Sequence, residues 1–160
     1  MIQPAIQTIE AKQLVGVGCT MSLTNFMVAE VWQLFMKQRA CWGHLQVGDL
    51  FSVTVYPPEY FVDFHPKNTF EKWAAVELAP NCQPPNELAT INLPAGLYAV
   101  FTHRGLSTDN SIFQYIFTQW LPDSPYIVDH RPHFEILSPQ YQPNNPQAAE
   151  TIYIPIRHRV

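Results

Sequence analysis

The chain has 160 residues, of which 47% are hydrophobic and 13% aromatic, and its formal net charge is −4. This length suits one compact domain or two small repeated modules that share a core. The only basic cluster is a short run at residues 157–160, so the sequence lacks the grouped cationic side chains that contact nucleic-acid phosphates. Direct nucleic-acid binding is therefore not expected.

The charged fraction of 14% is low against the roughly 25% of an ordinary soluble protein. Few charges and many aromatic side chains are consistent with an aromatic-lined cavity, with a large core or with a dimer interface, and composition does not separate these three. The acidic balance favours cationic over anionic small molecules as ligands.

The cysteines indicate a reducing compartment. Cys19, Cys41 and Cys82 are odd in number, widely spaced and without a CxxC motif, which is not the pattern of a disulfide framework. The N-terminus lacks a basic segment followed by an apolar one, and no run of about 18 apolar residues occurs. We therefore expect a soluble cytoplasmic protein with neither a signal peptide nor a membrane partner.

Residues 6–22 (IQTIEAKQLVGVGCTMS) alternate around Gly16 and Gly18 as a β-strand does. The GVG triplet resembles part of a phosphate-binding loop, but the third glycine and the strand–helix–strand context are missing. The two glycines are interpreted instead as places where the strand bends or bulges.

From residue 24 the apolar period changes to that of a helix, with a stripe that begins at Met27 and ends at Phe35. Residues 49–60 and 69–80 then predict two strands, because apolar and polar side chains alternate in the first of them. The first part of the chain thus runs strand, helix, strand, strand.

The turn-rich segment 81–87 is the natural internal boundary, and after it the same order of elements recurs. The pattern predicts a strand in 88–105, a helix in 107–124, a strand in 125–139 and a terminal strand in 151–158. We therefore predict an α+β fold: duplicated βαββ modules related by pseudo-twofold symmetry, with antiparallel sheets, helices on one face and a ligand cleft between the halves. The chain is expected to be one domain, 1–160, with halves 1–80 and 88–160.

Glu135 interrupts an apolar run, HFEILSP, and a carboxylate in such a place lies either on a wet face of a sheet or in a pocket. Alternation along a strand places Glu135 with His133 and Leu137, whereas Phe134 and Ile136 point the other way, into a core under the helix. If the helix covers the Phe134 face, Glu135 faces the cleft between the halves.

Several motifs together resemble a known family. GLYAVFTHRG (96–105), QWLPDSPY (119–126), HRPHFE (130–135) and ETIYIPI (150–156) resemble the second half of the GyrI-like family, and FEKWAAVEL (70–78) is similar to a strand of its first half. This family provides the effector-binding domain of AraC-type and multidrug-sensing bacterial transcription regulators. The resemblance covers essentially the whole chain.

The resemblance implies a cavity with a carboxylate at its base, surrounded by aromatic rings, that receives large lipophilic cations. Glu135 is the matching carboxylate. It also implies a stand-alone module of the kind found on integron cassettes, with a link to transcription regulation. A protein partner, either a regulator or a gyrase-like target, is left open. Relatives include a gyrase inhibitor that works by protein contact, and hydrolases of strained cyclopropane compounds that use a glutamate and a tryptophan, here Glu135 and Trp120.

The chemistry of such a site is simple. Burial disfavours an unpaired carboxylate, and a cationic ligand supplies the missing charge. Aromatic faces add about 0.5–2 kcal/mol each through cation–π attraction. The candidates for the lining, beside Glu135, are Trp73, Tyr98, Trp120, Tyr126 and Tyr153. The alternative for Glu135 is an exposed strand residue, or an ion-pair partner of Arg131 or Arg104.

The segment DHRPHFE also invites a metal site. On a strand, however, His130 and His133 lie on opposite faces, and no HExxH helix motif is present. No GxSxG motif occurs either. We expect no metal and no cofactor. The favoured function is ligand binding, the first alternative is a hydrolase that uses Glu135 and Trp120, and the second is an inhibitor that acts by protein–protein contact.

Overall fold

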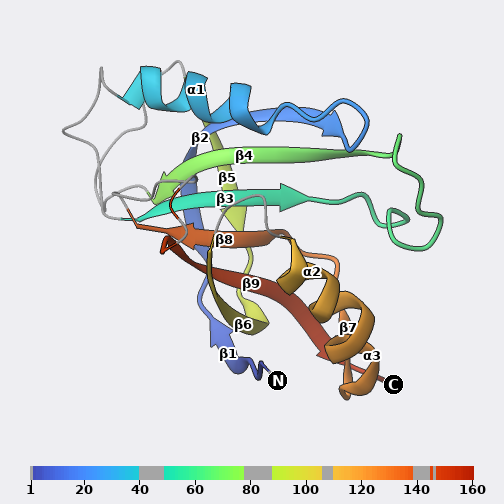
Figure 1. Cartoon of the computed structure of the whole chain (residues 1–160). Helices are drawn as coiled ribbons and strands as arrows, with labels where there is room; N and C mark the ends of the chain where they lie inside the picture. Colours follow the sequence, from blue (N-terminus) through green and yellow to red (C-terminus); the bar gives the residue numbers. More distant parts are fainter. Residues whose placement is uncertain (1, 40–48, 78–87, 106–109, 139–144, 146) are drawn as a thin grey trace.

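The computed structural model describes residues 2–39, 49–77, 88–105, 110–138, 145 and 147–160, so the predicted connector 81–87 lies outside the described residues. None of the described helices is long and apolar enough to cross a bilayer. Figure 1 shows the elements in chain order. They are β1 (Ala5–Ile9), β2 (Lys12–Ser22), α1 (Val28–Arg39), β3 (Leu50–Val55), β4 (Thr69–Glu77), β5 (Ala89–Leu93), β6 (Gly96–Arg104), α2 (Ser111–Tyr115), the π-helical turn η2 (Ile116–Trp120), α3 (Leu121–Asp123), β7 (Tyr126–Val128), β8 (His133–Leu137) and β9 (Ala149–His158).

The strands form one antiparallel sheet in the order β1-β6-β9-β8-β3-β4-β2-β5, with β7 paired to β9. The order reads symmetrically about its middle, where β3 pairs with β8. The outer strand β1 pairs with β6, and the outer strand β5 pairs with β2. The predicted α+β fold with its antiparallel pairing is confirmed, and the two halves share a single sheet.

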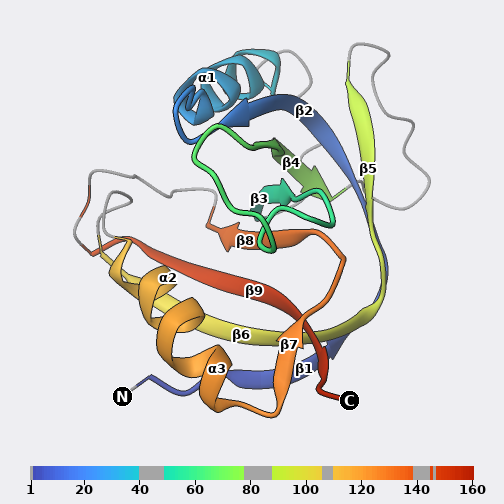
Figure 2. The same cartoon turned by 90° about the vertical axis from the view of Figure 1, so that its right-hand side faces the viewer.

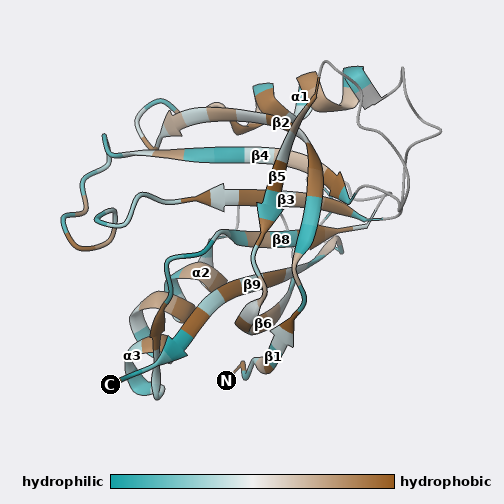
Figure 3. Ribbon diagram, turned by 180° about the vertical axis from the view of Figure 1, so that it is seen from behind, coloured by the Kyte–Doolittle hydropathy of each residue, from teal (hydrophilic) through white to brown (hydrophobic). Residues whose placement is uncertain are grey.

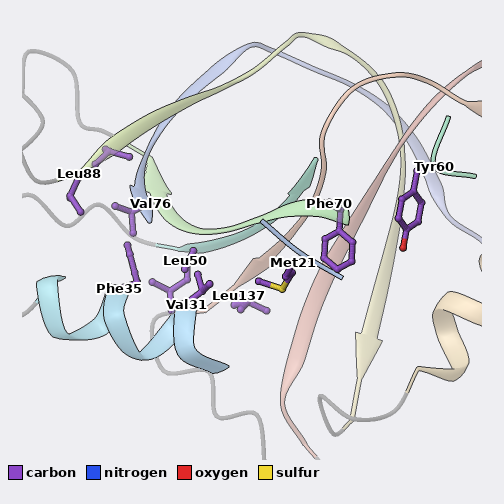
Figure 4. Close-up of a cluster of buried hydrophobic side chains, with 11 residues drawn as sticks. Met21, Val31, Phe35, Leu50, Tyr60, Phe70, Val76, Leu88 and Leu137 are labelled. Atoms are coloured by element: carbon purple, nitrogen blue, oxygen red, sulfur yellow. The ribbon is translucent and has the colours of Figure 1, made fainter. Parts of the chain in front are cut away.

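Both helical segments cover the same face of this sheet (Figure 2). Under α1, Val31 and Phe35 pack on residues of β2, β3 and β4 and on Leu137, as Figure 4 shows. Under α2 and η2, Ile112 and Ile116 pack on apolar residues of β6 and β9. The other face has its own core, around Phe51, Val53, Tyr98 and Phe134. The sheet is therefore buried on both faces, which suits a chain with so few charges.

Phe134 lies on the face of the sheet opposite to the one predicted. Leu137, which alternates with Glu135, packs under α1, and Phe134 belongs to the core on the far face. The helices thus cover the side that carries Glu135, and the expected arrangement was wrong. Strand alternation had grouped these residues correctly, but β8 has apolar side chains on both faces, so alternation alone does not say which face a helix covers.

Gly16 and Gly18 lie opposite Ala75 and Trp73 in the β2–β4 ladder. A Cβ atom at Gly16 would clash with the Ala74 carbonyl oxygen, and one at Gly18 would enter the Trp73 ring. The glycines therefore allow close contact between two strands. They lie within β2, which continues to Ser22 before α1 begins at Val28, so they do not form the loop between a strand and a helix that binds phosphate.

Candidate functional site

A row of polar side chains crosses the helix-covered face of the sheet. Its members come from five adjacent strands and are placed by register, because directly opposed residues point to the same face. Glu150 lies opposite His103, Ser52 lies opposite Glu135, and Thr54 lies opposite both His133 and Lys72. We call the following residues the polar strip: His103, Glu150, Glu135, Ser52, Thr54 and Lys72.

The polar strip separates the core under α1 from the core under α2 and η2. It crosses β4 at the hydrophilic stretch that Figure 3 shows between hydrophobic ones. Beside it, under α2 and η2, is a cavity of about 40 Å³, which has room for water but not for a drug-sized molecule. The cavity is lined by Thr54, Tyr56, Phe113, Phe117, His133, Phe134, Glu135, Ile152, Tyr153 and Ile154.

Glu135, which lines this cavity, meets a second carboxyl group, that of Glu150. Glu135 and Glu150 are diagonal neighbours across β8 and β9, and their side chains share a hydrogen bond. Burial, followed by the adjacent charge of Glu135, raises the pKa of Glu150 to about 9, although the Lys72 ammonium opposes this shift. The pair therefore retains one proton at neutral pH, and one negative charge is available to a ligand.

This proton links stability to pH. The Glu150 pKa is about 9 in the folded protein against 4.5 for a free side chain, so the folded state binds more protons between these values. Stability should accordingly fall as pH rises from about 5 to about 9. Glu150→Gln should remove this dependence and be more stable than the parent at pH 8.5, which denaturant midpoints at pH 5, 7 and 8.5 will measure. Parallel pH profiles of the two proteins would contradict the shared proton.

Aromatic rings close the cavity. Phe61, in the loop between β3 and β4, stacks on Phe117 of η2 with ring centroids 5.7 Å apart. Its ring also lies 6.1 Å from His133, which in turn meets Tyr56 edge-on at 4.9 Å. Burial lowers the pKa of His133 to about 3, with Lys72 and Arg131 adding to the effect, so this imidazole is neutral. Burial also raises the pKa of the Tyr56 hydroxyl, which therefore stays protonated.

The predicted ligand residues fall in three places. Glu135 lines the cavity. Tyr153 is also among its lining residues, but its ring packs in the core of the far face, where it stacks on Phe134 at 4.5 Å. Trp73 and Tyr98 belong to the core of the far face, and Tyr98 is fully buried there beneath the Arg131 guanidinium, 4.6 Å away. These two do not face the cavity, because strand register turns them away from Glu135.

Trp120 and Tyr126 lie elsewhere again. Their rings stack on each other at 6.3 Å, and Trp120 also packs edge-on against Phe101. Both line an open hollow of about 370 Å³ between the α2–α3 segment and the N-terminal residues Gln3, Pro4 and Ile6. Neither is among the residues that line the Glu135 cavity.

The alternative partners of Glu135 are engaged with other groups. Arg131 pairs with Asp129 at 2.9 Å and donates to the Leu97 carbonyl, and Arg104 donates to the Gln147 carbonyl at 2.8 Å. Glu135 itself is half-buried, so it is not an exposed strand residue.

Sequence reasoning missed Glu150 and Lys72, and both left a signal. Glu150 alternates with Ile152 and Ile154, and Lys72 alternates with Phe70 and Ala74. Each of these polar residues thus points to the same face of its strand as buried apolar neighbours, as Glu135 does with Leu137. The terminal strand was expected to begin at residue 151, but β9 begins two residues earlier, at Ala149, and so includes Glu150.

Comparison with known proteins agrees with this fold. A model of the GyrI-like small molecule binding domain matches residues 2–157, whereas no curated protein matches the chain. The structure of SAV2435 bound to tetraphenylphosphonium is similar at 15% identity and a TM-score of 0.71, covering 98% of this chain and 94% of that one. An integron cassette protein from the mobile metagenome of Vibrio cholerae is similar at 13% identity and a TM-score of 0.61, covering 98% of this chain and 97% of that one.

A hydrolase encoded by lin2189 from Listeria innocua is also similar, at 9% identity and a TM-score of 0.63, covering 97% of this chain and 92% of that one. At these identities the structural likeness concerns the fold alone. The family model, in contrast, spans nearly the whole sequence and confirms the family expected from the motifs. The chain therefore belongs to the GyrI-like family of small-molecule binding domains.

Proposed function

We propose that this protein captures lipophilic cations in the cavity that contains Glu135. The observation that carries the proposal is the carboxyl pair, because Glu135 and Glu150 hold one negative charge between the apolar core under α1 and the apolar core under α2 and η2. A charge in such surroundings gains most from a ligand of opposite sign that is itself cheap to desolvate. Delocalised organic cations meet that requirement, and compact hydrated ones do not.

The rings around the cavity support the same ligand class. Phe113, Phe117, Tyr56 and the neutral His133 line it, and the faces of phenyl and phenol rings attract cations. The similar protein SAV2435 is described as bound to tetraphenylphosphonium, a cation of this kind.

The cavity is too small for the proposed ligands, so its walls must move before a ligand can bind. At about 40 Å³ it cannot hold a phosphonium or dye molecule unless its walls move. Phe61 is 46% exposed and covers Phe117, a lining residue of the cavity, from a loop, so the Phe61–Phe117 stack is the part of the wall nearest to solvent that a ligand can displace. We therefore expect ligand entry to separate these two rings.

Isothermal titration with tetraphenylphosphonium tests the proposal, with neutral triphenylphosphine oxide as the matched control. The parent protein should bind the phosphonium and not the oxide. It should also bind the phosphonium more tightly at pH 8.5 than at pH 6, because the cation favours loss of the shared proton. Equal affinity for the two compounds would show that the carboxyl pair plays no part in recognition.

A hydrolase is the second candidate, and the carboxyl pair is again the reason. A protonated carboxyl can donate a proton to a leaving group while its neighbour accepts one from water. Trp120, the expected partner in this chemistry, lies in the other hollow. Turnover of a reactive hydrophobic ester that is lost in both Glu135→Gln and Glu150→Gln would favour this function over simple capture.

A further inference from the structure

Lys72 is an unexpected member of the polar strip. It follows the buried Phe70 and precedes the buried Ala74 along one face of β4, and it lies opposite Thr54. Its Nζ atom donates a hydrogen bond to the Thr54 Oγ1 atom at 2.9 Å, and Thr54 lines the cavity. A fixed cation is thus held at the edge of a cavity whose proposed ligand is itself a cation.

The Lys72 ammonium group affects the pKa values of two groups near the cavity, His133 and Glu150. Its charge lowers the pKa of His133 after the larger effect of burial, and it opposes the raised pKa of Glu150. The ion pairs seen among the described residues, Lys12–Glu77, Arg131–Asp129 and Arg157–Asp129, leave Lys72 out. Its charge is therefore offset by the nearby carboxyl pair and not by a direct ion-pair contact.

The charges at the cavity and beside it form a dipole. The pair Glu135–Glu150 supplies one negative charge and Lys72 supplies one positive charge, while His133 and Tyr56, which line the cavity, are uncharged. A simple cation gains from the carboxyl pair and loses against Lys72. A ligand with its own dipole gains at both ends, because an anionic group can accept a hydrogen bond from the Lys72 ammonium.

We propose that Lys72 makes the site selective for lipophilic zwitterions, molecules that carry a delocalised cation and an anionic group a few bonds away. This inference rests on the proposed function, since it assigns the ligand class of the same cavity. Lys72 is a specificity residue here. It raises the affinity for ligands that carry an anionic group besides the cation, and it is not required for the fold of β4.

Two probes of one skeleton test the inference at pH 7. They are (4-carboxybutyl)triphenylphosphonium, whose carboxyl group is ionised at this pH, and pentyltriphenylphosphonium, which lacks it. Because both probes need the same opening of the cavity, its cost cancels from their ratio. The parent protein should bind the carboxylated probe about tenfold more tightly, since a hydrogen bond between charged groups is worth that much.

Lys72→Met keeps the length of the side chain but removes its charge, so it should reverse the order of the two probes. Lys72→Arg should keep the parent's preference. Lys12→Met, which removes a cation that pairs with Glu77 on the same sheet, is the matched control and should change neither affinity. Circular dichroism will show that each variant is folded.

The possible results separate the two claims. If tetraphenylphosphonium binds the parent but the carboxylated probe has no advantage over the pentyl probe, the inference about Lys72 is overturned and cation capture stands. The same holds if Lys72→Met leaves the ratio unchanged. If neither probe nor tetraphenylphosphonium binds the parent, both the proposed function and this inference fail.

Discussion

The double variant Glu135→Gln/Glu150→Gln should bind tetraphenylphosphonium at least roughly 30-fold more weakly than the parent at pH 7, a loss of about 2 kcal/mol or more. Both carboxyl groups have to be replaced. When Glu135 alone becomes glutamine, burial still raises the Glu150 pKa but the adjacent charge no longer adds to it, so Glu150 ionises more readily and restores part of the attraction. Each single variant should therefore fall between the parent and the double variant.

A matched control comes from two carboxylates far from the cavity. Glu30 is exposed on α1, and Glu77 forms a half-exposed pair with Lys12 at 3.7 Å. Replacing both with glutamine removes two negative charges, against one for the carboxyl pair at pH 7, and it should still leave the affinity within a factor of about two, because exposed charges are screened. Calorimetric titrations of the three proteins decide the matter. Equal losses in both double variants would mean that net charge, and not the cavity, attracts the cation.

Phe134→Ala should lower the free energy of unfolding by about 3–5 kcal/mol, because it removes a buried aromatic ring from a packed core. Phe134 is 2% exposed and stacks on Tyr153 at 4.5 Å, with Tyr98 at 5.3 Å and Phe51 at 5.8 Å. Guanidinium denaturation followed by tryptophan fluorescence measures the change.

Phe26→Ala provides the comparison, because Phe26 is 59% exposed and its removal should cost no more than about 0.5 kcal/mol. A loss below about 1 kcal/mol for Phe134→Ala would mean that the Phe134 ring is not enclosed as described. The assignment of the two faces of β8, and with it the position of Glu135, would then need revision.

The elements of the fold could be read from the sequence because their signals are local. Alternation predicted β3, and the stripe from Met27 to Phe35 predicted α1, which begins at Val28. The order of elements after the connector predicted the second half of the sheet. The alternation of side chains along β8 correctly placed Glu135 on the same face as His133 and Leu137.

The site itself depends on pairings between distant residues, and no local pattern contains these. Glu135 meets Glu150 only because β8 pairs with β9, and Lys72 comes near only because β3 lies between β4 and β8. Trp120 was expected to line the cavity beside Glu135. A π-helical turn, η2, ends at this residue, so the phase of an ordinary α-helix does not predict where its ring points.

Each half of the sheet is completed by an outer strand from the other half of the chain, and this arrangement restricts how the cavity can open. β1 adds to the half of the sheet that follows it in sequence, and β5 adds to the half that precedes it, as in a domain-swapped dimer contained in one chain. A hinge motion that parts the halves along β3 and β8 would have to strip both outer strands from their partners. The adaptable parts are then the pieces that lie above the sheet, the α2–η2 segment and the loop that carries Phe61. Related chains could accept ligands of very different size by changing these two pieces while the sheet stays the same.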